Sequence, residues 1–253
     1  MSRLLAITAL FWLLLAGPAL PQRIVSALSD QNVSIDSNFT GKTLTLFGNV
    51  EPSVGDQTLA NRGPFDLVIV IRGPAATHTV REKTPQLGVW LNSGSESFAN
   101  TPGFFYVLSS KELDKITTPE TLAENEISFN SVFGIDANGQ ATDPEYTSEL
   151  RRLLAKKGLE GVNEHAVNFL SPTFYSTQLD LPANVPSGLY LVKTFLFSEG
   201  ELIEDRSVVF TVRTAGIERF LESTSRENPW AYGLASVLLA LFTGWLGSVA
   251  FKR

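Results

Sequence analysis

An uncharged run of 22 residues, Trp230–Phe251, stands near the end of this 253-residue chain. At a rise of about 1.5 Å per residue, a helix of that length spans roughly 33 Å, enough for a hydrocarbon core of about 30 Å. Trp230 and Tyr232 stand at one end, where interfacial aromatic residues are expected. A core helix of a globular domain is the alternative, although such helices seldom run so long without a charge. We therefore expect a transmembrane helix over 229–251 and a tail at 252–253.

Four small residues of this run are spaced four apart, so they share one face of a helix. Small side chains at this spacing let two membrane helices approach closely. We expect this face to pack against another membrane protein or a second copy of the chain; the alternative is that small residues are simply common in membrane helices. The four residues are Ser236, Ala240, Gly244 and Ser248.

The first 27 residues are interpreted as a signal peptide. Leu4–Ala16 is apolar apart from Thr8, and the run is too short to span a bilayer well. Cleavage after Ala19 or after Ala27 fits the small-residue rule, and an uncleaved first helix is the alternative. With the basic pair Lys-Arg at the C-terminus, the positive-inside rule predicts an inner (cytoplasmic) membrane protein whose body is exported to the periplasm and whose tail is cytoplasmic.

The overall composition narrows the classes of partner and site. The formal net charge is −6, which argues against nucleic acid, because phosphate binding needs clustered Lys and Arg. The chain has no Cys, so disulfides, thiol nucleophiles and Cys-based zinc sites are excluded.

Between the two apolar ends, residues 28–213 have the pattern of a mainly β, Ig-like sandwich. Turn residues recur about every ten positions, and the near-continuous apolar run Phe65–Ile71 indicates a buried strand. The segment Pro186-Ser187-Gly188-Leu189-Tyr190 is typical of the entry to the penultimate Ig strand, where a Tyr hydroxyl ties back the corner. Gly188–Phe197 and Glu204–Val212 are expected to form a hairpin.

Residues 110–165 break the strand rhythm and indicate a helical insertion. Thr118 and Asp143 each precede a Pro, which predicts two helix starts with a side-chain cap followed by Pro at the first helical position. Glu145 and Glu149 lie early in the second helix and the basic residues lie late, which is the order of charges that the helix dipole favours. Gly158 marks the end of this helix. The connector from the sandwich to the membrane helix is placed at 214–228.

Several segments together resemble the alphaproteobacterial putative transmembrane protein family. They are VSIDSNFTGKTLTLFGNV, DLVIVIRGP, VREK followed by GVWLN, LPANVPSGLYLVKTFLFSEG, AGIERFL and NPWAYGL, in this order along nearly the whole chain. The resemblance implies a membrane protein without a particular activity, with permeases of the sulfite-exporter type as a partner class. In the family pattern this segment contains more basic residues, and Glu82 departs from that pattern.

The sequence carries no recognisable catalytic motif. The two His residues, His78 and His165, are not in a metal-binding spacing, and neither phosphate-binding glycine signature nor a G-x-S-x-G elbow occurs. Asp136-Ala137-Asn138-Gly139 resembles the start of a calcium loop, but the twelfth position is Thr147 rather than Glu. We expect no catalytic residue, no metal and no cofactor.

The candidate binding residues are Arg81, Lys83 and Trp90. Arg81 and Lys83 share one face of a strand by period two, and Trp90 would lie near them if the following strand pairs with theirs. A cation beside an indole can bind an anion or a partner loop; a solvated basic strand with a core Trp is the alternative.

These expectations favour a non-enzymatic, single-pass envelope protein that binds or supports another membrane protein, such as a permease. One alternative is a membrane-tethered receptor for a small anionic ligand, which would need a preformed pocket lined by aromatic residues and Arg. Another is an envelope enzyme that uses paired carboxylates about 5–10 Å apart, for example on a glycan.

Overall fold

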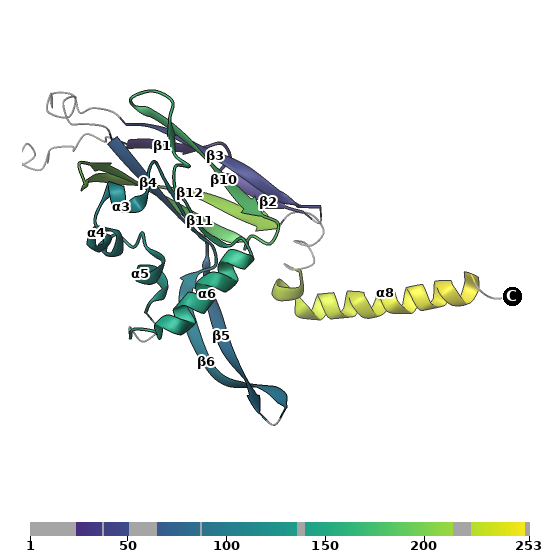
Figure 1. Cartoon of the computed structure of the whole chain (residues 1–253). Helices are drawn as coiled ribbons and strands as arrows, with labels where there is room; N and C mark the ends of the chain where they lie inside the picture. The colour runs from purple at the N-terminus through teal and green to yellow at the C-terminus, as the bar shows by residue number, and fades with distance from the viewer. Residues whose placement is uncertain are drawn as a thin grey trace, which may run out of the picture.

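The computed structural model is mainly β, with several curled sheets, a helical insertion and one apolar helix at the C-terminal end (Figure 1). It describes residues 24–36, 38–50, 65–86, 88–135, 140–214 and 224–250. Most of the predicted signal peptide, the calcium-like segment 136–139, most of the connector and the basic tail lie outside these residues. β1 begins at Ile24, within the segment 1–27 assigned to the signal peptide.

The first sheet has four antiparallel strands in the order β1-β3-β10-β9. Side chains of its two long central strands alternate between a buried and a more exposed face, the period of two that follows from strand geometry. One face of this sheet therefore belongs to the core. The strands are β1 (Ile24–Leu28), β3 (Gly41–Val50), β9 (Asn168–Phe169) and β10 (Phe174–Pro182).

The second sheet has six strands in the order β2-β12-β11-β4-β7-β8. Its edge strands pair in parallel, β2 with β12 and β8 with β7, whereas the inner pairs are antiparallel. The strands are β2 (Asn32–Ile35), β4 (Phe65–Arg72), β7 (Phe105–Ser109), β8 (Glu160–Asn163), β11 (Gly188–Ser198) and β12 (Glu201–Thr214).

The run predicted as a buried strand is β4, in the middle of this sheet. Leu67 to Ile71 are all buried, with both faces of the strand covered. Neighbouring β7 meets the insertion through Phe105, whose ring makes edge contacts with Phe129 and Phe133 at centroid distances of 6.2 and 5.8 Å. Two-sided burial explains why this segment is continuously apolar rather than alternating.

The helical insertion contains α3 (Leu113–Ile116), α4 (Pro119–Glu124), α5 (Phe129–Phe133) and α6 (Pro144–Lys156). The predicted caps are present: the Thr118 side chain accepts from Thr121 N–H, and the Asp143 side chain accepts from Glu145 N–H. Gly158, with φ of +70°, follows the last helix in the left-handed conformation that glycine adopts without strain.

The predicted corner and hairpin are also present. The Tyr190 hydroxyl donates to the Pro186 carbonyl at 2.7 Å. β11 and β12 pair along their length and join through Glu199 and Gly200, whose φ values of +51° and +90° are those of a tight hairpin turn.

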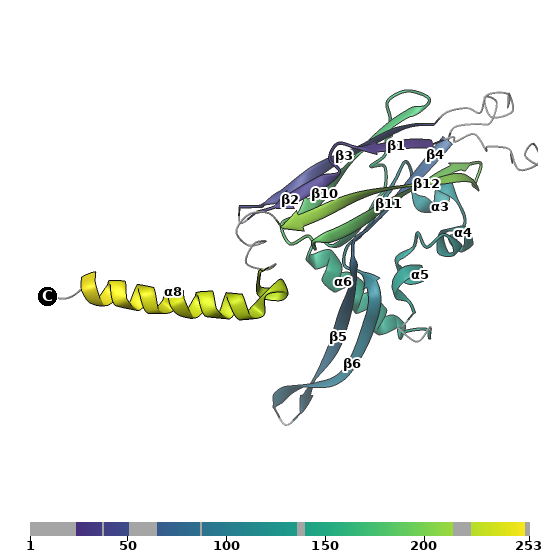
Figure 2. The same ribbon diagram turned by 180° about the vertical axis from the view of Figure 1, so that it is seen from behind.

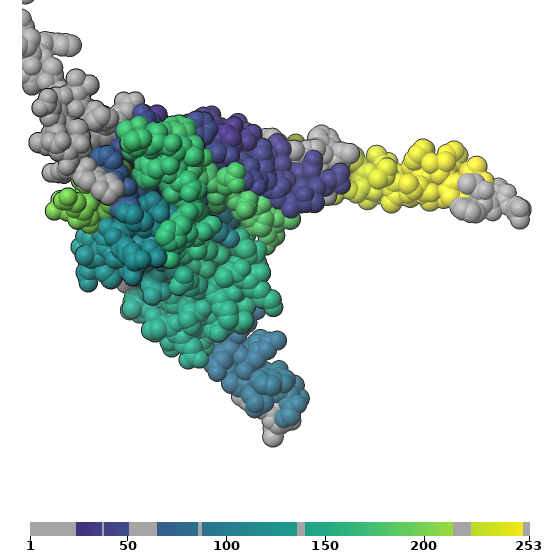
Figure 3. All heavy atoms as spheres, turned by 45° about the horizontal axis from the view of Figure 1, so that its top comes forward, coloured from purple at the N-terminus to yellow at the C-terminus, as the bar shows by residue number. Residues whose placement is uncertain are grey.

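One part of the predicted sandwich lies outside it. β5 (Ala75–Gln86) and β6 (Val89–Pro102) form a separate two-stranded sheet, a long hairpin that projects from the body (Figures 1 and 3). The spacing of turn residues predicts that both strands belong to the sandwich. It fails here because alternation along a strand does not reveal whether a second sheet covers that strand.

The C-terminal apolar helix is α8 (Pro229–Ala250), which extends away from the β body (Figure 2). Pro229–Val249 is long and apolar enough to cross a membrane, and none of it is buried against the body. The alternative of a core helix in a globular domain is therefore not supported.

Candidate functional site

The root of the β5–β6 hairpin is packed against the body. Val80 and Phe98 are buried there, and α6 approaches so closely that a Cβ on Gly94 would collide with the Tyr146 hydroxyl. At the base, the His78 ring hydrogen-bonds to the Pro102 carbonyl at 3.3 Å. Partial burial lowers the pKa of His78. Thus His78 is a half-buried structural residue rather than a solvated one.

The hairpin brings Lys83 and Trp90 onto one face and places Arg81 closer to its root. Lys83 is paired with Asn92, and Trp90 with Pro85, so Lys83 and Trp90 are diagonal neighbours across the two strands. Arg81 lies two residues nearer the root, on the other side of a β-bulge in the register between Glu82 and Lys83. Both cation–π contacts among the described residues lie elsewhere, at Phe129 and Phe195. The predicted pairing is present, but Trp90 is a surface residue and not a core one.

The tip carries two further apolar residues that the sequence reasoning missed. Val89, Trp90 and Leu91 are 60%, 66% and 48% exposed. They lie in a stretch without a charge between Lys83 and Glu96. That absence of charge is the available signal, whereas the spacing of residues predicts only that Trp90 lies near Arg81 and Lys83 or in the core.

Arg81 also borders a cleft of about 360 Å³ between the hairpin and α6. Three carboxylates line the same cleft, and one of them, Glu149, already pairs with Arg152 at 2.8 Å. The surroundings of Arg81 therefore oppose the binding of a small anion. The cleft is lined by Val80, Arg81, Glu82, Glu145, Tyr146, Glu149, Arg152 and Leu153.

A second hollow, of about 540 Å³, lies beside the hairpin root and is lined in part by Ile135, Leu189 and Leu191. Its Arg72 is held by Glu126 twice, through the carboxylate and the backbone carbonyl, both at 2.6 Å. The Arg72 guanidinium therefore already has its hydrogen-bond partners within the protein.

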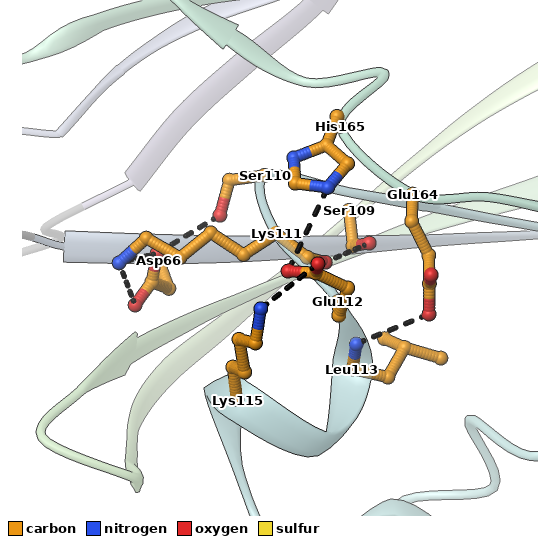
Figure 4. Close-up of polar contacts among 9 residues, drawn as sticks. All are labelled: Asp66, Ser109, Ser110, Lys111, Glu112, Leu113, Lys115, Glu164 and His165. Carbon is orange, nitrogen blue, oxygen red and sulfur yellow. Dashed lines mark hydrogen bonds and ion pairs between the residues drawn. The ribbon is translucent and has the colours of Figure 1, made fainter.

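A polar cluster joins β4, the segment before α3 and the turn after β8 (Figure 4). Lys111 pairs with Asp66 at 3.0 Å, and Glu112 lies 2.9 Å from Lys115 and 3.6 Å from His165. The hydrogen bond from Lys115 lowers the pKa of Glu112. The carboxylate of Glu164 accepts from the Leu113 N–H at 3.3 Å, at the start of α3. These groups are mutually satisfied, and the cluster fastens α3 to the sheet.

The described residues contain no group of three His, Cys, Asp or Glu side chains arranged to hold a metal ion. Buried Glu160 pairs with Arg151 at 3.1 Å, which joins β8 to α6.

In α8, the predicted small face is open. Nothing outside the helix lies within 4 Å of a Cβ built on Gly244. The Ser236 hydroxyl donates to the Tyr232 carbonyl of its own helix at 2.8 Å, a bond that satisfies the hydroxyl without a partner helix. Ala240 and Ser248 are likewise exposed on this face.

A family model described as "Putative transmembrane protein (Alph_Pro_TM)" matches residues 23–253. The chain belongs to this family. The match includes both the β body and α8, the candidate membrane span of this Alph_Pro_TM protein.

No curated protein matches the sequence. Among solved structures, the chain is similar to the N-terminal domain of the Streptococcus gordonii adhesin Sgo0707, with 12% sequence identity and a TM-score of 0.30. The similarity covers 75% of this chain but spans only about a third (32%) of the adhesin chain.

Proposed function

We propose that this Alph_Pro_TM protein is a non-enzymatic, single-pass envelope protein whose periplasmic β body is tethered by α8, and that α8 binds another membrane protein. The observation that carries the proposal is an apolar helix with no buried residue and an open face of small side chains. In lipid no hydrophobic force drives helices together, so close packing needs a face of this kind.

The strand order supports an Ig-like body. Ig domains place strands A, B, E and D in one sheet and strands C, F and G in the other. With β1, β3, β10 and β9 taken as A, B, E and D, the first sheet has this order. β4, β11 and β12 then correspond to C, F and G, and the Tyr190 bond lies at the start of F, where the tyrosine corner is expected. Under this assignment the hairpin and the helices are an insertion between C and D.

The test of partner binding compares two substitutions in α8. Gly244→Leu places a bulky side chain on the small face and should reduce crosslinking of the full chain to its partner in native membranes. Leu239→Ala is the matched control, because it changes a different face of the same helix and removes bulk instead. Equal crosslinking yields from the two variants would show that α8 only tethers the body.

Orientation is tested by reporters fused after Arg253. The basic tail predicts activity of a reporter that works in the cytoplasm. A signal from a reporter that matures only in the periplasm would contradict the proposed inner-membrane topology.

A receptor for a small anionic ligand is the alternative function. Of the three predicted binding residues, Arg81 shares its cleft with three carboxylates. Arg72, which lines the second hollow and was not a predicted binding residue, is occupied by Glu126. These contacts favour the partner-binding proposal over the anion receptor.

A further inference from the structure

The exposed tip of the β5–β6 hairpin and the membrane anchor leave the body at the same end. β4 and β12 are both antiparallel to β11, so they run in the same direction and end at the same edge of the sheet. β5 follows β4 after only two residues, and the connector to α8 follows β12. The hairpin therefore projects from the end of the body that carries the anchor.

The lengths of the two segments are compatible with a common contact plane. The twelve residues of β5 extend about 40 Å at roughly 3.3 Å per residue. Residues 224–227 of the connector are helical, and the Asn228 N–H bonds to the Thr224 carbonyl. The nine residues 215–223 can reach at most about 30–32 Å at ~3.3–3.6 Å per residue, and the helical residues add about 7 Å at ~1.5 Å each. The tether can thus hold α8 in a bilayer while the hairpin reaches the bilayer surface. In Figures 1 and 2, the tip lies below the start of α8, displaced sideways from the axis of that helix.

The chemistry of the tip suits a membrane interface. Trp is enriched where hydrocarbon meets headgroups, and Val89 and Leu91 add aliphatic surface beside Trp90. Lys83, one diagonal step behind Trp90, can lay its stem along the apolar surface and direct its ammonium group to lipid phosphates. In the headgroup region, water and lipid headgroups can hydrogen-bond to the unpaired backbone groups at the edges of the hairpin. The hydrocarbon core offers no such partners.

We propose that Val89, Trp90 and Leu91 form a second membrane contact, in which the hairpin tip docks on the headgroup region of the bilayer that holds α8. The contact would orient the β body relative to the membrane, which a single flexible tether does not do. This inference rests on the proposed membrane anchoring, but not on a partner for α8.

The experiment uses Trp90 as its own reporter. The four Trp residues of the chain are Trp12, Trp90, Trp230 and Trp245. The full chain with the other three replaced by Phe is reconstituted alone in phosphatidylcholine–phosphatidylglycerol vesicles containing phosphatidylcholine brominated high on its acyl chains. Trp90 is expected to emit at a shorter wavelength than a Trp exposed to water. Its emission should also be much weaker in vesicles with brominated lipid than in vesicles without it.

The matched control moves the Trp to the opposite end of the body. Leu170 is 67% exposed, close to the 66% of Trp90, and it precedes β10 beside the end of β3, away from the anchor. A chain in which Trp90→Phe is combined with Leu170→Trp should show water-exposed emission without quenching.

Three other results would overturn the inference. Unquenched, water-exposed emission from Trp90 would show that the tip does not touch lipid. Emission at shorter wavelength without quenching would indicate that the tip packs on protein, in this reconstitution a second copy. A chain that retains only Trp230 reports separately on α8: if its quenching is also absent, the membrane anchoring itself fails, and the proposed function falls with the inference.

Discussion

At the scale of single residues, the Tyr190 hydroxyl is the clearest case of one polar group fastening the fold. The ring is fully buried, stacked on Phe210 with centroids 4.8 Å apart, and burial raises the pKa of the hydroxyl, which keeps it protonated as a donor to Pro186. Tyr190→Phe should lower the free energy of unfolding by about 1–2 kcal/mol, because the Pro186 carbonyl loses its partner. Urea unfolding of the full chain in mild detergent, followed by circular dichroism, measures the loss. Tyr106→Phe is the control: its hydroxyl makes a longer bond, 3.3 Å, to the Gly158 carbonyl, and its loss should cost less. An equal effect of the two changes would contradict the special role of the corner.

At the scale of elements, the four-stranded sheet requires a residue without a side chain at Gly48, near the end of β3. A Cβ on Gly48 would collide with the Val25 carbonyl and lie 2.5 Å from the Tyr175 hydroxyl, which shares a 2.6 Å hydrogen bond with Ser26. Gly48→Ala should therefore destabilise the body by about 1–3 kcal/mol through overpacking. Gly88→Asn is the control: its φ of +82° is tolerated by Asn and nothing lies within 4 Å of its Cβ. Thermal unfolding of both variants gives the comparison, and an unchanged midpoint for Gly48→Ala would show that β1 and β10 yield easily.

At the scale of the whole molecule, the position of β1 bears on where the predicted signal peptide would be cleaved. Ile24 is fully buried, and Ile24–Leu28 pairs with β3 along its length. Cleavage after Ala27 would remove four of the five residues of β1, whereas cleavage after Ala19 leaves the strand whole. We predict a mature protein that starts at Leu20, measured by the intact mass of the purified chain. Ala19→Gln should block processing and Ala27→Gln should not; a mature start at Leu28 would refute the prediction.

The sequence alone determined the features that depend on near neighbours. The uncharged length of Trp230–Phe251 predicts a membrane helix, and the caps at Thr118 and Asp143 predict two helix starts. β4 was recognisable because two-sided burial leaves a continuous apolar run, and the Tyr190 corner because its partner is only four residues away. In each case the deciding interaction is local, so residue type and spacing carry enough information.

Only the tertiary structure decided what covers each strand and what surrounds each charge. Residues 75–102 alternate like sandwich strands, yet they leave the sandwich and expose Trp90 at a tip. The sequence predicts Arg81 as part of a binding site with Lys83 and Trp90, but α6 brings Glu145 and Glu149 to the cleft beside Arg81 from more than 60 positions away. The parallel pairing of β2 with β12 joins strands from opposite ends of the sequence of the β body. Periodicity and composition show only that one face of a strand is apolar. They do not show whether a distant element or a membrane covers that face, because this depends on long-range contacts that local periodicity does not encode.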